Sequence, residues 1–337
     1  VTPEEVYQEE AKTRHNIRAL VNCIQRQVSP EARPFVHFSV TSMDIMDSAN
    51  AWRFMEANKE VVLPLCLKLL NTLIALARRE KETVQMGRTH GQHAVPITFG
   101  FTVAEYVSRY GNRLEKIKAA AENLRGKIAG AVGAYNAGSL FFTDPEVFEE
   151  EVLAELGLKP SPYSTQIVEP EYFTDYFHAL ISAFGVLANL ADDFRHLQRT
   201  EIAEICEEFT PNQVGSSTMP HKRNPWNLEH VKSMWKAFVP RMITIYLDQI
   251  SEHQRDLSNS ASSRFNPEIV VAFAGVVERL NRVLNRLVVN KEQMHKNFDE
   301  TKELVIAEPL YILLASFVPI LLAIAFFLLK IHLFLNA

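Results

Sequence analysis

Long stretches of helical periodicity are the feature of this sequence that most restricts its fold. Apolar residues recur three and four positions apart in five segments. These segments are Ala51–Thr83, Phe99–Arg125, Glu171–Glu208, Trp226–Ile250 and Pro267–Phe298. Alternation of apolar and polar residues over strand lengths is rare, and 12 glycines in 337 residues do not favour a sheet with many turns. Because such helices exceed the globular average of about 11–12 residues, the sequence predicts an all-α bundle of long helices.

Composition and charge indicate which classes of binding partner and which cellular setting suit this chain. Hydrophobic residues make up 47% and charged residues 22% of the chain, which is ordinary for a globular protein. The 35 Lys and Arg against 40 Asp and Glu give a net charge of −5, which argues against nucleic acid because its binding depends on a basic surface. Cys23, Cys66 and Cys206 are widely spaced and form no disulfide framework, so we expect a reducing, cytoplasmic setting.

Both ends of the chain are unusual. The N-terminus begins at Val1 without a signal peptide, and we expect it to continue from an upstream segment. Pro309–Leu329 contains 21 residues without a charge and precedes Lys330, a length that suffices to cross a bilayer. Three interpretations stay open: a core helix of a large helical protein, a foreign or frameshifted tail, and a membrane anchor. A membrane is the least favoured partner, because nothing else in the chain resembles a membrane protein.

Polar stretches between the helical segments are the expected places of function. Gly215–Pro225 is a loop because it contains one Gly and two Pro, and it carries serines, a lysine and an asparagine. A serine hydroxyl acts as a base or nucleophile when a cation or N–H donors stabilise its oxyanion, and Lys222 supplies a cation. Lys222 and Asn224 equally suit a carboxylate ligand. A solvated linker is the alternative without function.

A second polar stretch, Gly87–Pro96, holds two imidazoles. His90 and His93 lie three residues apart, beside Arg88 and Thr89. Imidazole is the side chain best suited to proton transfer near neutral pH. Metal ligation is disfavoured, because no cysteine or carboxylate set accompanies the two histidines. A structural histidine in a turn is the other alternative.

Three weaker patterns complete the set. In Phe35–Asp47, Thr41 and Ser42 precede Asp44, a pattern typical of a helix start. Such side chains cap the exposed backbone N–H groups, and a helix start can also bind an anion. His15 follows a short basic run and is otherwise an ordinary surface residue. Further along the chain, Arg255 and Arg264 flank several hydroxyls and suit a phosphate, with a solvated helix face as the alternative.

Taken in order, these motifs resemble the adenylosuccinate lyases of the fumarase/aspartase superfamily. Gly215–Pro225 matches the superfamily loop GSSxMPxKxNP, which is long and specific. Four further motifs select this member: Thr41-Ser42-x-Asp44-x-x-Asp47, Arg88-Thr89-His90-Gly91, Arg195–Glu201 and Arg255-Asp256-Leu257-Ser258-x-Ser260. Ser164–Val168 is similar to the family's substrate-binding segment. The resemblance runs from about Lys12 to about Ala315.

The resemblance implies a fold and an assembly. Central helices of four subunits form a twenty-helix core in this family, and each active site is built from three subunits of the homotetramer. The implied domains are the remainder of an N-terminal helical domain at residues 1–47, a central bundle at 48–300, and the start of a C-terminal region with an anomalous apolar tail at 301–337.

The resemblance also implies a reaction. It is that of a C–N lyase of purine nucleotide synthesis, which releases fumarate by β-elimination from adenylosuccinate, leaving AMP, or from the related succinylated imidazole carboxamide ribotide. No metal or organic cofactor is implied. Ser216 would be the base, His90 the acid, His15 an assisting histidine, and Lys222 the cation that stabilises the developing charge. The implied substrate-binding residues are Thr41, Ser42, Thr89, Gln166, Ser217, Asn224, Arg255, Ser260 and Arg264.

Departures from the family pattern keep alternatives open. Asn16 stands where the family has Asp, and the sequence given begins after the family's upstream Arg-Tyr pair. The sequence from about Ser316 matches nothing recognised in the family. Argininosuccinate lyase or a cycloisomerase of the superfamily is the first alternative, although Arg255 and Arg264 favour a phosphorylated substrate. A non-catalytic structural relative is the second, and the presence of Ser216 with its partner residues argues against it.

Overall fold

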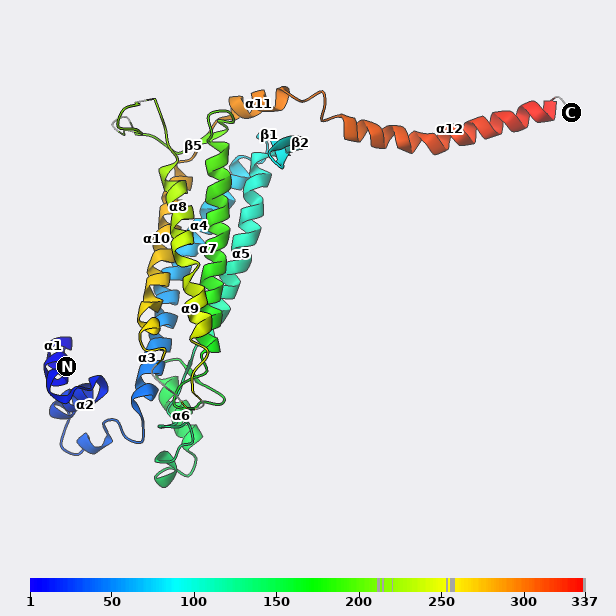
Figure 1. Cartoon of the computed structure of the whole chain (residues 1–337). Coiled ribbons are helices and arrows are strands. Elements are labelled where there is room, and N and C mark those ends of the chain that lie inside the picture. Colours follow the sequence, from blue (N-terminus) through cyan, green and yellow to red (C-terminus); the bar gives the residue numbers. More distant parts are fainter. Residues whose placement is uncertain (211–212, 214, 220, 253, 255–257, 336–337) are drawn as a thin grey trace. The chain divides into compact units, whose positions relative to one another are not determined.

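The computed structural model describes residues 1–210, 213, 215–219, 221–252, 254 and 258–335. The chain divides into two compact units, each assembled from three stretches of sequence. Unit 1 comprises Val1–Leu70, Arg109–Asn189 and His230–Leu280, and unit 2 comprises Asn71–Ser108, Leu190–Glu229 and Asn281–Ala337. Five helices (Figure 1) contribute residues to both units: α4 Leu63–Arg79, α5 Phe99–Glu122, α7 Glu171–Leu197, α8 Trp226–Phe238 and α10 Asn266–Asn285.

Unit 1 is a helical bundle with a small irregular region. Its other helices are α1 Pro3–Thr13, α2 Asn16–Gln27, α3 Ser42–Ala57, α6 Pro145–Ala154 and α9 Arg241–Leu247. A parallel pair of two-residue strands joins β3 Arg125–Gly126 to β4 Lys159–Pro160. Between α7 and α10 the rings of Phe184 and Phe273 meet edge to face, with centroids 6.0 Å apart, and both side chains are fully buried. Such close contacts are how long apolar helix faces are covered.

Unit 2 contains the rest of the long helices and most of the extended structure. Its elements are the antiparallel hairpin β1 Val84–Thr89 and β2 Gln92–Thr98, the short antiparallel pair β5 Ile205–Cys206 and β6 Val288–Val289, and the helices α11 Lys291–Asp299 and α12 Ala307–Leu335. Buried Phe99 and Phe194 bring α5 and α7 together, with ring centroids 5.7 Å apart. The hairpin therefore sits directly before a packed long helix.

The bundle predicted from periodicity is confirmed, but several predicted helices are divided. Trp226–Ile250 is two helices, because Pro240 caps the start of α9 and lacks the N–H that a continuous helix needs. Pro267–Phe298 is also two helices, with Asn290 as the N-cap of α11. Ala51–Thr83 is interrupted by the π-helical turn Asn58–Val62. Apolar spacing continues across each of these breaks, so periodicity alone did not reveal them.

The polar stretch Gly87–Pro96 lies within the β1–β2 hairpin, which the sequence did not predict. Thr89 pairs with Gln92, so the turn contains only His90 and Gly91. Both turn residues have positive φ, 54° for His90 and 75° for Gly91, as a tight two-residue hairpin turn requires. Short polar strands around such a turn lack the apolar alternation that identifies strands in a sequence.

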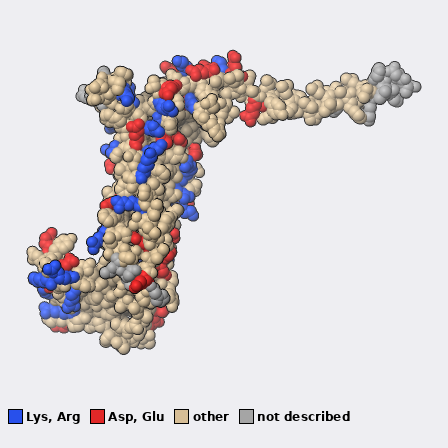
Figure 2. All heavy atoms as spheres, in the orientation of Figure 1, with Lys and Arg blue, Asp and Glu red and all other residues tan. Residues whose placement is uncertain are grey.

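The apolar C-terminal segment forms α12, with Pro319 inside it. Its described side chains from Ala307 to Leu329 are exposed, and Figure 2 shows almost no charged atoms along it. Two helical stretches in the described part of the chain have the length and hydropathy to cross a membrane, and they differ in burial. The apolar 18-residue window within Ser42–Arg79 is 28% buried, whereas the window within Ala307–Leu329 is 0% buried. Within this chain, α12 is therefore not a buried core helix.

Candidate active site

The loop that carries the predicted serine base belongs to unit 2 and folds around the Ser216 hydroxyl. Ser216 Oγ accepts hydrogen bonds from the backbone N–H groups of Thr218 at 3.4 Å and Met219 at 3.2 Å. Two N–H dipoles aimed at one hydroxyl oxygen favour the deprotonated form over the neutral one. The turn thus places two hydrogen-bond donors on the oxygen of the predicted base.

The base of this loop is closed by a close backbone approach. A Cβ atom on Gly215 would lie 1.9 Å from the Lys222 carbonyl oxygen, so only glycine fits there. Asn224 Nδ2 donates to the Gly215 carbonyl at 2.9 Å, which leaves one amide hydrogen for a ligand. The Lys222 side chain is exposed and forms no ion pair with any residue that the structure describes. The loop therefore holds Ser216 and a free ammonium group on one short stretch.

The segment after α7 holds this loop in place through hydrogen bonds of the Gln198 side chain. Gln198 Nε2 donates to the Arg223 carbonyl at 3.2 Å, and its Oε1 accepts from the Glu207 N–H at 2.9 Å. The buried Glu207 carboxylate in turn accepts from the Leu228 N–H at 2.9 Å. Gln198 belongs to a motif identified in the sequence, but its role did not follow from it. Glu207 gave no sequence signal, because an isolated Glu in a polar stretch resembles a surface residue.

The predicted acid, His90, lies exposed at the tip of the β1–β2 hairpin, next to Thr89. Arg88 ties the hairpin to a buried carboxylate, because its Nη2 donates to Glu204 at 2.7 Å. On the paired strand, His93 Nδ1 lies 2.8 Å from the Thr301 hydroxyl. Thus the imidazole of His93 has a structural partner, while that of His90 is presented to solvent. These contacts distinguish the two imidazoles, which their residue type and spacing alone leave equivalent.

In unit 1, the predicted assisting histidine serves as a helix cap. His15 is the N-cap of α2, and its Nδ1 accepts from the Arg18 N–H at 3.3 Å. An accepting Nδ1 places the ring proton on Nε2, so Nε2 is the atom available to a ligand. Asn16 bonds to the Ile17 N–H at 2.8 Å instead of supporting the His15 ring.

The predicted anion-binding residues Thr41 and Ser42 lie at the start of α3. The Thr41 N–H donates to Asp44 Oδ2 at 2.6 Å, as expected for a helix start. Gln166 lies in a loop that is fastened to the same helix, because the Val168 N–H donates to Asp47 Oδ2 at 3.0 Å. The structure thereby brings these three candidates to one region of unit 1.

The predicted phosphate-binding residues are only partly covered by the structure. Arg264 lies in the short 3₁₀ helix Ser262–Phe265, where its side chain is exposed, and Ser260 lies in the preceding turn. Arg255 lies outside the described residues. Ser217, the remaining candidate of the serine loop, is exposed beside Ser216.

Two further features bear on what the site can do chemically. Burial raises the pKa of the Cys206 thiol, which keeps it protonated at neutral pH and unsuited to act as a nucleophile. Among the described residues, no group of three or more His, Cys, Asp and Glu side chains is placed to hold a metal ion. The predicted site residues themselves carry hydroxyl, imidazole and ammonium groups, which suit proton transfer and charge stabilisation.

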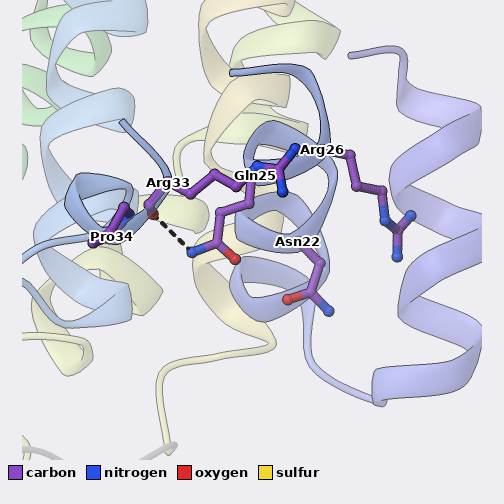
Figure 3. Close-up of a pocket in the computed structure, with 5 residues that line it drawn as sticks. All are labelled: Asn22, Gln25, Arg26, Arg33 and Pro34. Atoms are coloured by element: carbon purple, nitrogen blue, oxygen red, sulfur yellow. Dashed lines mark hydrogen bonds between the residues drawn. The ribbon is translucent and has the colours of Figure 1, made fainter. Parts of the chain in front are cut away.

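Two surface pockets in unit 1 lie away from these residues. A pocket of about 600 Å³ in unit 1 is lined by Asn22, Gln25, Arg26, Arg33 and Pro34 (Figure 3), and Gln25 Nε2 donates across it to the Arg33 carbonyl at 3.0 Å. A second pocket of about 720 Å³, also in unit 1, lies between α5 and α7. Neither pocket is lined by a predicted site residue. Of the twelve predicted site residues that the structure describes, six are exposed and six are partly buried.

Comparisons with known proteins identify the family. Residues 3–237 match the family model described as lyase. The chain is 37% identical over 319 residues to adenylosuccinate lyase from Aquifex aeolicus, covering 93% of this chain and 70% of that protein. It is 34% identical over 301 residues to adenylosuccinate lyase from Bacillus subtilis, with 89% and 68% covered. The chain belongs to the adenylosuccinate lyase family.

Solved structures of the superfamily agree with this membership in fold. The crystal structure of fumarate lyase from Mesorhizobium sp. BNC1 superposes with a TM-score of 0.80 at 24% identity, covering 94% of this chain and 71% of that one. The 3-carboxy-cis,cis-muconate lactonizing enzyme from Pseudomonas putida gives 0.78 at 26% identity, with 94% and 70% covered. The predicted all-α superfamily fold and the assignment to the C–N lyases of the adenylosuccinate lyase family are confirmed.

Proposed function

We propose that this chain cleaves adenylosuccinate to AMP and fumarate, and the succinylated imidazole carboxamide ribotide to its carboxamide and fumarate. The relatives named adenylosuccinate lyase support the substrate class, because they match nine-tenths of the chain at 34–37% identity. The observation that carries the chemistry is the turn at Ser216, in which two backbone N–H groups converge on the hydroxyl oxygen.

In the proposed reaction, the Ser216 oxyanion removes the proton from the succinyl carbon β to the nitrogen. The electron pair left on that carbon spreads into the adjacent carboxylate, where the Lys222 ammonium and the remaining amide hydrogen of Asn224 stabilise the negative charge. The same electron pair then forms the double bond of fumarate as the C–N bond breaks. His90 donates a proton to the departing nitrogen, and Ser216 is left protonated.

The other candidates hold the substrate. Thr41, Ser42, Thr89, Gln166 and Ser217 bind the fumaryl part or the nucleotide, and Arg255, Ser260 and Arg264 bind the phosphate and ribose. His15 assists at the leaving group or at an anionic part of the substrate through Nε2, the nitrogen not used as a cap. These assignments follow the match of each position to the family motifs.

We infer a cytoplasmic homotetramer whose active sites are shared between subunits. Exposed apolar side chains on the long helices support association, since Leu67 and Val271 are 52% and 71% exposed in a single chain. The domain division at residues 47 and 300 also stays a proposal.

The decisive experiment measures fumarate release from adenylosuccinate by the full chain and by two variants. Ser216→Ala and His90→Ala each remove a proton-transfer group, so we expect turnover to fall by about 10²–10⁴-fold. Ser139→Ala and His295→Ala are the matched controls, because both residues lie outside the proposed site and are exposed. Full turnover by Ser216→Ala, or fumarate release from argininosuccinate but not from adenylosuccinate, would overturn the proposal. A wild-type chain that converts only a muconate substrate would favour the cycloisomerase alternative.

A further inference from the structure

A buried carboxylate organises the first turn of α3. Asp44 is 0% exposed, and its two oxygens accept from the backbone N–H groups of Thr41 at 2.6 Å, Gly130 at 3.1 Å and Ala129 at 3.2 Å. A carboxylate that gathers this many donors is held in one orientation. It therefore fastens the start of α3 to the loop that follows β3.

The charge of Asp44 is neutralised inside the protein. Lys127, also 0% exposed, donates to Asp44 Oδ1 and, at 3.1 Å, to the Gly130 carbonyl. Ser48 lies about one turn after Asp44 on α3. Its hydroxyl accepts from the Lys127 N–H at 3.0 Å and donates to the Lys127 carbonyl at 3.1 Å. A buried pair of this kind is a poor source of net stability, because desolvation of both charges offsets their attraction. Its effect here is to define geometry.

The next carboxylate on the same helix fastens a third segment. Asp47 Oδ2 accepts from the Val168 N–H at 3.0 Å, two residues after Gln166. The loop after β3 also touches this segment, because a Cβ on Gly133 would lie 2.1 Å from the Ser164 carbonyl oxygen. Gly133 has φ of 76°, which suits glycine. Hydrogen bonds and close backbone contacts thus connect the start of α3, the loop after β3 and the 164–168 segment.

We propose that Asp44, neutralised by Lys127, and Asp47 are positioning residues for the fumaryl-binding side of the active site. Asp44 fixes the position of Thr41 and Ser42, and Asp47 fixes the position of the segment that carries Gln166. The inference rests on the proposed substrate-binding function of Thr41, Ser42 and Gln166. A bare carboxylate at this place would repel a substrate with two carboxylates. Lys127 removes that repulsion while leaving the carboxylate free to collect backbone donors.

The first test compares fumarate binding with AMP binding. Replacing one partner alone leaves a buried charge and endangers folding, so the main variant is Asp44→Asn with Lys127→Met, which removes both charges. We expect product inhibition by fumarate to weaken at least tenfold, because an amide cannot accept from three N–H groups, while inhibition by AMP changes less than twofold. Asp175→Asn, an exposed carboxylate elsewhere in unit 1, is the control.

The second test uses Asp47 and does not depend on the buried pair. Asp47→Ala removes the acceptor for the Val168 N–H and should weaken fumarate inhibition several-fold, whereas Asp47→Asn keeps an acceptor oxygen and should restore most of it. Equal loss of fumarate and AMP binding in the folded variants would show a general structural role and overturn the proposal. Unchanged fumarate inhibition in both Asp47→Ala and the double variant would also overturn it. If the wild-type chain neither cleaves adenylosuccinate nor binds AMP, the proposed function itself fails.

Discussion

At the scale of single residues, the candidate site depends on atoms whose roles are set by the backbone around them. Ser216 is an ordinary hydroxyl until the N–H groups of Thr218 and Met219 converge on it. His90 differs from His93 only through the turn that exposes it and the Thr301 contact that engages its neighbour. The motifs in the sequence named these side chains, but spacing alone does not show which N–H or hydroxyl faces which ring.

The glycine beside the serine gives a prediction at this scale. In Gly215→Ala, the new Cβ would lie 1.9 Å from the Lys222 carbonyl, so the base of the loop must open and the Ser216 turn shifts. We expect turnover to fall about 100-fold or more, since misplacement by about 1 Å has that effect on catalysis. The check is fumarate release measured beside Gly275→Ala, whose added Cβ meets nothing within 4 Å. Equal activity of the two variants would contradict the described loop.

At the scale of elements, periodicity predicted the long helices because each has an apolar face to bury. It did not predict the break at Pro240, the π-helical turn Asn58–Val62 or the β1–β2 hairpin. Those features depend on backbone geometry rather than on apolar spacing. The burial of polar side chains was not predicted either, because Lys127 and Glu204 look like surface residues in a sequence. Their burial follows only from long-range contacts.

The ion pair behind the hairpin gives an element-scale prediction. Glu204 is fully buried and accepts from Gln85 at 2.7 Å and Asn297 at 2.9 Å besides Arg88. Glu204→Gln leaves Arg88 without its counter-charge, and breaking a buried pair costs about 3–5 kcal/mol. We expect the free energy of unfolding in urea to fall by an amount near the lower end of that range. Glu201→Gln, an exposed neighbour, should change it by about 0.5 kcal/mol or less; an equally small effect of Glu204→Gln would count against the described contacts.

The contact between α1 and α2 gives a pH prediction. Hydrogen bonds from Arg26 at 2.7 Å and Asn22 at 2.9 Å lower the pKa of Glu9 from 4.5 to about 2. A carboxyl whose pKa is lowered on folding adds stability above its unfolded pKa of 4.5 and loses it as pH falls towards 2. Unfolding in urea between pH 5 and 3 should therefore show a shallower loss of stability for Glu9→Gln than for the wild type. Parallel curves would exclude this linkage.

At the scale of the whole molecule, family membership accounts for the bundle, and α12 is the part that the family pattern does not explain. From Leu310 to Leu329 its large apolar side chains are at least half exposed in the single chain. An exposed apolar surface of this extent drives association with other chains or with lipid. What covers this surface distinguishes two of the sequence-based interpretations, a core helix of an assembly and a membrane anchor; the third, a foreign or frameshifted tail, is a separate question.

A pair of substitutions tests this association. Leu321→Glu with Ile324→Lys places two charges in the apolar stretch, and we expect this variant to form smaller particles than the wild type in aqueous buffer. Light scattering measures the sizes, and flotation with phospholipid vesicles distinguishes lipid binding from self-association. Lys302→Glu with Glu303→Lys, just before α12, keeps the net charge and is the control. Identical particle sizes for all three proteins would contradict the prediction.

The role of Ser216 in fumarate release is tested by the initial rate of fumarate formation from adenylosuccinate, measured for the full chain and for Ser216→Ala side by side. We expect steady release by the wild type and a loss of about 10²-fold or more in the variant, with AMP appearing in equal amount to fumarate. Equal rates for the two proteins would contradict the assignment of Ser216. No release by a folded wild-type chain would contradict the proposed reaction.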